Sequence, residues 1–245
     1  MNDRAVNDLS SPDADLDEFL DKWRGRWPEW RIAQVFVAES QRGTGEAWFA
    51  LLQECTDAAW AGDDPTPGFA KLAWWQEELH GWAKGLRRHP LGRVLQKRPA
   101  PWAMLAAALP ALQAVREPLR AWAPPQTLMA QLQPLADAIA DCERVLFGSD
   151  AVSNAAHQEE CRADPFSLLA AHALWHRDEA ADAAQAQAWA RRLATTAPQQ
   201  RAEARPRRIH DALSLARIRR VAAAGEVSAL SPPVALWRSW RAARG

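Results

Sequence analysis

The sequence contains no tyrosine, and it has only three cysteines, at positions 55, 142 and 161. Three cysteines without metal-site spacing predict reduced thiols in a cytoplasmic protein rather than a disulfide framework. No run of about 18 apolar residues occurs, so we expect no transmembrane helix. The polar first fifteen residues also predict that no secretory signal is present. Because 30 basic side chains balance 30 acidic ones, net charge gives no argument for nucleic acid as a partner.

The balanced charge is unevenly distributed along the chain. Residues 1–22 carry seven acids, and residues 1–13 are expected to form a disordered acidic arm. From Pro198 onwards there are ten arginines and three acids. Such a basic face could contact an anionic membrane, a diphosphate or an acidic protein partner. Alternatively, it is a solvated, arginine-rich surface.

Fourteen tryptophans stand out in a chain of 245 residues. They are expected to form a bulky aromatic core, and the alternative is that some of them line an apolar ligand cavity. Alanine and leucine dominate, β-branched residues are sparse, and prolines and glycines recur at helix-sized intervals. The sequence therefore predicts an all-α protein in which residues 14–245 form a single helical bundle.

Glycine and proline positions predict several helix boundaries. Gly43-Thr44-Gly45 is expected to break the chain before a helix over residues 46–61. A helix that starts at Asp164 and Pro165 is expected to continue to about residue 195. The last helix is predicted over residues 232–243, with a serine as its N-cap.

Residues 69–95 are the most informative part of the sequence. Apolar residues there recur at alternating steps of three and four and line one helix face, namely Leu72, Trp75, Leu79, Trp82 and Leu86. Pro90 should stop this helix at Leu86–His89. The order Lys71-Leu72-Ala73-Trp74-Trp75-Gln76-Glu77-Glu78-Leu79, followed by His89-Pro90, resembles the squalene/phytoene synthase family. The resemblance implies an isoprenoid-synthase-type bundle and head-to-head joining of prenyl diphosphates with Mg²⁺.

In that family, two aspartate-rich motifs on facing helices hold Mg²⁺ against the substrate diphosphates, since hard cations demand oxygen ligands. Arg177-Asp178-Glu179-Ala180-Ala181-Asp182 resembles the second motif. A helical wheel places Asp178 and Asp182 on the same apolar arc as Trp175 and Trp189. The two acids are therefore candidates for metal and diphosphate binding, and the two tryptophans are candidates for lining the cavity. Alternatively, the acids reach water or pair with arginines.

The first motif is mostly missing. By comparison with the family it should lie at Cys55-Thr56-Asp57-Ala58-Ala59-Trp60, where the acids four residues apart are replaced by Thr56 and Trp60. Asp57 remains, but the wheel places it opposite the apolar stripe, where it faces solvent or an edge. Asp63 and Asp64 could replace the lost ligands only if their Gly/Pro loop folds back.

Two further patterns carry weaker predictions. His172 and His176 are spaced as two metal ligands on one helix face, but no third ligand is spaced to join them. We therefore expect surface or packing histidines. The run Arg217-Ile218-Arg219-Arg220 resembles an amphipathic helix end, where basic side chains interact favourably with the helix C-terminus.

Three hypotheses follow for the function. In the first, the chain is a squalene/phytoene synthase-like protein that has lost the condensation and acts as a binding or assembly protein, because losing one acid cluster removes metal-based charge stabilisation. Its partner would be a protein, a prenyl diphosphate or another apolar ligand. The alternative is an active prenyltransferase with altered metal ligation through Asp178, Asp182 and arginines. In the third, the chain is a helical scaffold whose cavity has filled with tryptophan.

Overall fold

The structure, a computed structural model, describes residues 12–148, 164–176, 183–196, 202 and 204–244. Within these residues it is all-α, without strands. The elements are α1 (Pro12–Arg26), α2 (Trp30–Ala33), the 3-10 helix η1 (Gln34–Phe36), α3 (Glu39–Trp60), α4 (Pro65–Trp82), α5 (Gly92–Leu95), α6 (Trp102–Ala108), α7 (Pro110–Ala114), α8 (Arg116–Arg120), α9 (Pro125–Phe147), α10 (Phe166–Trp175), α11 (Ala183–Thr195), α12 (Arg205–Ala224) and α13 (Pro232–Ala243). Most of the predicted acidic arm, residues 1–11, lies outside the described residues. In the part of the chain that the structure covers, no helix combines the length and apolar composition needed to cross a membrane.

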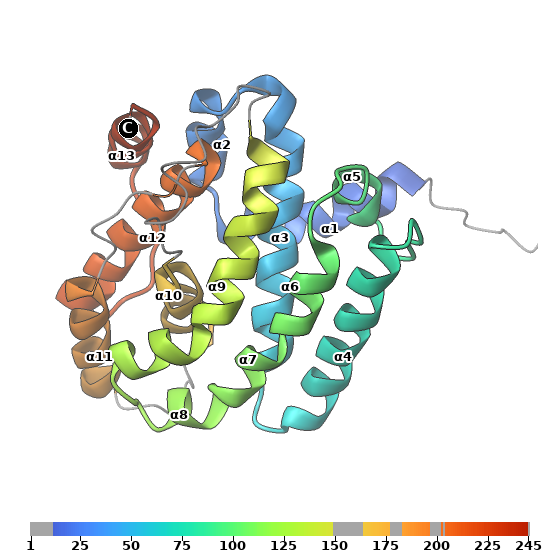
Figure 1. The fold of residues 1–245 in the computed structure, drawn as a ribbon. Helices are drawn as coiled ribbons and strands as arrows, with labels where there is room; N and C mark the ends of the chain where they lie inside the picture. Colours follow the sequence, from blue (N-terminus) through green and yellow to red (C-terminus); the bar gives the residue numbers. More distant parts are fainter. Residues whose placement is uncertain (1–11, 149–163, 177–182, 197–201, 203, 245) are drawn as a thin grey trace, which may run out of the picture.

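Helix α3 lies at the centre of the bundle. It contacts α1, α4, α5, α7, α9 and α10. Figure 1 shows α3 and α9 in the middle of the molecule, with α4 and α6 on one side and α10, α11 and α12 on the other. The last helix, α13, packs on α12, α2 and η1. Because α3 touches elements from both halves of the sequence, its side chains are where distant segments meet.

Tryptophan forms much of the core, as the sequence predicts. The buried hydrophobic residues form one continuous cluster that extends from α1 to α13. The most deeply buried indoles belong to Trp30, Trp48, Trp75, Trp102 and Trp189. Such large side chains bury 150–250 Å² each and dominate the energetics of a core. The aromatic core therefore supplies much of the driving force for folding.

The predicted break at Gly43-Thr44-Gly45 is wrong, because α3 runs unbroken through all three residues from Glu39 to Trp60. Two glycines in a helix cost roughly 0.5–1 kcal/mol each relative to alanine. Tertiary packing offsets this cost, since Gly45 is buried and the Trp30 ring lies 3.6 Å from where its Cβ would be. Packing against the Trp30 indole thus keeps Gly45 within the helix rather than at its end.

The long helix predicted from Pro165 to about residue 195 is also wrong. Helix α10 ends at Trp175, His176 is not helical, and α11 begins at Ala183. Trp175 and Trp189 therefore belong to different helices and do not share one helical arc. Residues 177–182, which include both predicted acids, lie outside the described residues.

Candidate functional site

Helix α3, which carries Thr56 and Trp60, faces α10, which ends at Trp175. The Trp60 ring on α3 lies 5.9 Å from the His172 ring and 5.9 Å from the His176 ring, measured between centroids. Thr56, one turn earlier, lines a cavity together with Ala171 and Trp175 of α10. The positions at which the family would place its first pair of acids therefore point toward α10.

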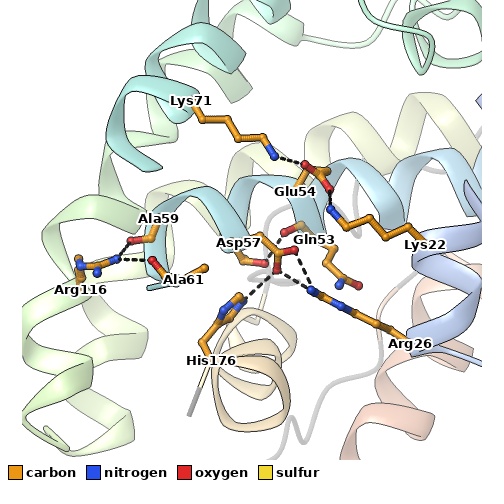
Figure 2. Close-up of polar contacts among 11 residues, drawn as sticks. Lys22, Arg26, Gln53, Glu54, Asp57, Ala59, Ala61, Lys71, Arg116 and His176 are labelled. Carbon is orange, nitrogen blue, oxygen red and sulfur yellow. Dashed lines mark hydrogen bonds and ion pairs between the residues drawn. The ribbon is translucent and has the colours of Figure 1, made fainter. Parts of the chain in front are cut away.

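Asp57 forms a charged cluster with α1 and with the end of α10 (Figure 2). Both of its carboxylate oxygens lie 2.9 Å from Nη1 of Arg26, and one lies 3.1 Å from Nε2 of His176. The Asp57 side chain is only 14% exposed, so the prediction that it faces solvent or an edge is wrong. The helical wheel placed Asp57 correctly on the polar side of α3. However, α1 and α10 pack against that side and shield the carboxylate from solvent.

The electrostatics of this cluster keep Asp57 ionised. Burial raises the pKa of the carboxyl group, but the contacts with His176 and Arg26 outweigh it and hold the pKa below its ordinary value. The Arg26 guanidinium also lies 5.7 Å from the centroid of the Trp175 ring. Asp57 is thus neutralised by side chains of the protein itself.

A small cavity lies between α1, α3, α10 and α12. Its volume is about 30 Å³. A water molecule needs about 10–15 Å³ on this scale, so the cavity has room for about two or three waters and not for a prenyl chain. Its lining is largely aromatic and polar, and consists of Trp23, Trp27, Phe49, Leu52, Gln53, Thr56, Ser167, Leu168, Ala171, Trp175, Arg207 and His210. The Thr56 hydroxyl donates to the Gln53 carbonyl of its own helix at 2.9 Å.

The two tryptophans predicted to line a shared cavity lie in different surroundings. Trp175 lines the small cavity and packs edge-on against Trp27, with ring centroids 5.9 Å apart. Trp189 is fully buried, and its indole N–H donates to the Ala123 carbonyl at 2.9 Å. Its ring packs against Trp122 and His172. Trp60, at a degenerate first-motif position, likewise donates its indole N–H to a backbone carbonyl, that of Leu112.

The histidine pair on α10 separates into two roles. His172 is buried among tryptophan rings, and burial together with the neighbouring His176 lowers its pKa to about 3. It is therefore a neutral packing residue, as expected. His176, whose side chain is 2% exposed, instead faces Asp57. Nothing in the spacing of the two histidines distinguishes these roles, because Asp57 comes from another helix.

The two acids of the loop, Asp63 and Asp64, interact with neighbouring helices. The Asp64 carboxylate accepts the backbone N–H of Thr66 at 2.9 Å and thereby caps α4. Asp63 is exposed and pairs with Arg120 of α8 at 2.9 Å. The nearby carbonyls at the end of α3, those of Ala59 and Ala61, accept from the buried Arg116 guanidinium (Figure 2). Contacts with α4 and α8 thus account for both acids.

In the segment that resembles the family, Glu78 and His89 have structural contacts that hold the turn after α4. The Glu78 carboxylate accepts the backbone N–H groups of Arg88 and His89 at 2.7 and 2.8 Å, and the indole N–H of Trp82 at 2.8 Å. The His89 ring packs against Trp75 at 4.6 Å, and its Nδ1 accepts the Leu91 N–H. Glutamate and histidine therefore fix the turn that follows α4.

His89 predicts a pH dependence of stability. Burial lowers its pKa to about 4 from an ordinary value of 6.5, so the unfolded chain binds this proton more readily than the folded chain. The contribution to stability is complete above pH 6.5 and falls as the pH drops toward 4. We expect His89→Asn, which keeps an acceptor for Leu91, to reduce the slope of unfolding free energy against pH between 6.5 and about 5, where carboxylates titrate little.

The measurement is urea unfolding at several pH values, and its readout is the slope rather than the absolute stability. The matched control is Leu86→Ala, because Leu86 is an exposed, non-titrating residue of the same turn region. An unchanged slope in His89→Asn would contradict the prediction.

Glu54 joins α3 to two of the helices that it contacts, α1 and α4. Glu54 lies 3.2 Å from Lys22 of α1 and also contacts Lys71 of α4, the first residue of the family-like segment (Figure 2). Both lysines are substantially exposed, so each pair contributes about 0–1 kcal/mol. Glu54 and Asp57 lie three residues apart on α3 and both pair with basic side chains of α1, which helps to fix α3 in the bundle.

The sequence did not identify the buried arginine that completes this region. Arg217, predicted to belong to a helix end, lies within α12 with a side chain only 2% exposed. It pairs with Glu29 and lies over the rings of Trp27 and Trp175, at 4.7 and 5.3 Å from their centroids. The sequence offered one signal, the isoleucine beside it, which indicates that this turn of α12 reaches the core.

The described residues do not fit the Mg²⁺ ions that the resemblance implies. Asp57 is the acid that remains from the first motif, and its oxygens already face a guanidinium and an imidazole. A cation at this position would be repelled by Arg26 and would have to displace it. In the part of the chain that the structure describes, no group of three or more His, Cys, Asp or Glu side chains is arranged to hold a metal ion.

The fold and site thus define an all-α protein with a tryptophan-rich core and a partly buried charged cluster between α1, α3 and α10. Comparison with protein-family models, with curated proteins and with solved structures finds no match.

Proposed function

We propose that the chain is a squalene/phytoene synthase-like protein that has lost Mg²⁺-dependent condensation and acts in the cytoplasm as a binding or assembly protein. The proposal includes an isoprenoid-synthase-type arrangement of its helices. It rests on the family-like order of residues 71–79 and His89-Pro90. It also rests on the chemistry of the described face between α3 and α10.

The observation that carries the proposal is the Arg26–Asp57–His176 cluster. Diphosphate departure requires metal ions or fixed cations aimed at the leaving oxygens. Here Arg26 neutralises the Asp57 carboxylate instead, and His176 contacts it. The adjoining cavity, about 30 Å³ in volume, is too small for a prenyl chain. A reaction chamber would need carboxylates to bind metal ions and space for a prenyl chain. The described face between α3 and α10 instead contains tryptophan side chains and internal ion pairs.

An assay of diphosphate release tests this proposal. Purified protein is incubated with Mg²⁺ and farnesyl or geranylgeranyl diphosphate, and inorganic diphosphate is measured. We expect wild-type protein to release no more diphosphate than Asp178→Asn or Asp182→Asn. Asp137→Asn, at an exposed position of α9, is the matched control for changing an acid elsewhere.

The alternative, an active prenyltransferase with altered metal ligation, predicts the opposite result. Robust release that is lost in Asp178→Asn but kept in Asp137→Asn would overturn the proposal. Calorimetry provides a second arm, because altered ligation through Asp178 and Asp182 requires Mg²⁺-dependent binding of a prenyl diphosphate. We expect no heat of binding that depends on Mg²⁺, and such a heat would favour the enzyme.

A further inference from the structure

The last helix, α13, presents its large apolar side chains to the outside. Its inward positions are small, with Ala235 and Ser239 fully buried against the helices that α13 contacts. With a repeat of 3.6 residues, the opposite face is formed by larger residues. These are 41–48% exposed and comprise Val234, Leu236, Trp237 and Trp240.

This orientation is the reverse of the usual pattern for a surface helix, in which the apolar stripe faces the core. The other twelve tryptophans of the chain are buried or partly buried. Two exposed indoles on adjacent turns of one helix, beside exposed valine and leucine, form a continuous apolar strip. Strips of this kind on a protein surface mark a site of interaction.

The strip is bordered by positive charge. Arg241 lies over the Trp237 ring at 5.5 Å from its centroid, and Arg244 lies over the Trp240 ring at 4.4 Å. From Val227 to the end of the sequence there is no aspartate or glutamate. Desolvation, together with repulsion from Arg219 and Arg241, lowers the pKa of Arg238. The positive charges of these arginines therefore repel one another, and no carboxylate of their own segment neutralises them.

We propose that the outward face of α13, formed by Val234, Leu236, Trp237, Trp240, Arg241 and Arg244, docks on an anionic lipid surface. Tryptophan at the level of the headgroups, aliphatic side chains below and arginines beside the phosphates are the composition of an interfacial helix. The exposed aliphatic side chains of Val234 and Leu236, which flank the two indoles, favour a bilayer over a nucleic acid. This inference goes beyond the proposed function and uses none of the residues of the α3–α10 site.

Co-sedimentation with vesicles tests the proposal. The vesicles consist of phosphatidylcholine alone or of phosphatidylcholine mixed with phosphatidylglycerol. We expect wild-type protein to bind the mixed vesicles and to lose binding at high salt. The double variant Arg241→Gln with Arg244→Gln should bind about 25-fold more weakly, because each arginine near an anionic surface contributes about a fivefold factor. Trp237→Ala with Trp240→Ala should weaken binding by about tenfold as well.

Leu86→Ala with Met104→Ala is the matched control, because both residues are exposed apolar side chains outside α13. This variant should bind as wild type does, and circular dichroism checks that every variant remains helical. Equal binding by wild type and both α13 variants would overturn the proposal, as would failure to bind the mixed vesicles. A tryptophan-dependent dimer, or binding to DNA, in the absence of vesicle binding would also overturn it.

Discussion

Replacing Glu29 with alanine is expected to lower the free energy of unfolding by about 3–5 kcal/mol. Glu29 accepts from Nε of Arg217 at 2.9 Å and from the backbone N–H of Leu230 at 2.5 Å. Its side chain and that of Arg217 are only 1% and 2% exposed. Removing the carboxylate leaves a guanidinium buried without its counter-charge, and the desolvation of that charge is no longer offset.

The effect extends to the candidate site because Arg217 lies between the rings of Trp27 and Trp175. A double-mutant cycle with Arg217→Ala isolates the pair. We expect the double variant to lose less stability than the sum of the single variants, because removing both partners leaves no buried charge unpaired.

Urea unfolding is the measurement, and the control is Asp63→Ala. Asp63 pairs with Arg120, but its side chain is 87% exposed, so its removal should cost about 0–1 kcal/mol. A loss of less than about 1 kcal/mol in Glu29→Ala would show that the buried pair does not stabilise the fold.

Replacing Gly68 with alanine is expected to cost about 3 kcal/mol, although alanine is the better helix former. Gly68 lies in the first turns of α4, where the helix crosses the backbone of α3. A Cβ at this position would overlap the carbonyl oxygen of Ala58. Because that atom belongs to the backbone, no side-chain rotation can relieve the overlap, and the two helices must separate.

The matched control is Gly43→Ala in α3. Gly43 is exposed, and its added Cβ would meet nothing within 4 Å. We expect this variant to be more stable than wild type by about 0.5–1 kcal/mol, because alanine has less conformational freedom to lose in the unfolded chain. Thermal or urea unfolding of both variants gives the comparison. Gly68→Ala is expected to lower the free energy of unfolding and Gly43→Ala to raise it. Changes of the same sign in the two variants would contradict the packing argument.

Much of the fold could be predicted from short stretches of sequence. The last helix was expected over residues 232–243 after a serine, and α13 spans Pro232–Ala243 with Ser231 as its N-cap. Asp164 was expected to start a helix, and its carboxylate accepts the Phe166 N–H at 2.7 Å. The Asp164 contact lies within one turn, so the sequence contains the whole interaction, whereas the Ser231 side chain makes no capping hydrogen bond.

The candidate site was less predictable. That Thr56 and Trp60 occupy degenerate motif positions stays a prediction, and the sequence did not predict the partners of Asp57. Arg26 lies 31 residues before Asp57, and His176 comes from a helix much later in the chain. No spacing rule joins residues at such separations, because their contact depends on how α1 and α10 pack on α3.

By itself, the sequence determined that the chain is helical, where several helices start, and that tryptophan forms much of the core. Periodicity, caps and the apolar content of each segment decide these properties locally. Only the tertiary structure decided that α3 continues through Gly43 and Gly45, that the predicted helix after Pro165 ends at Trp175, and that the large side chains of α13 face outwards. The physical reason is that burial and charge pairing are properties of the contact between helices. A local preference of about 1 kcal/mol is overridden whenever that contact contributes more.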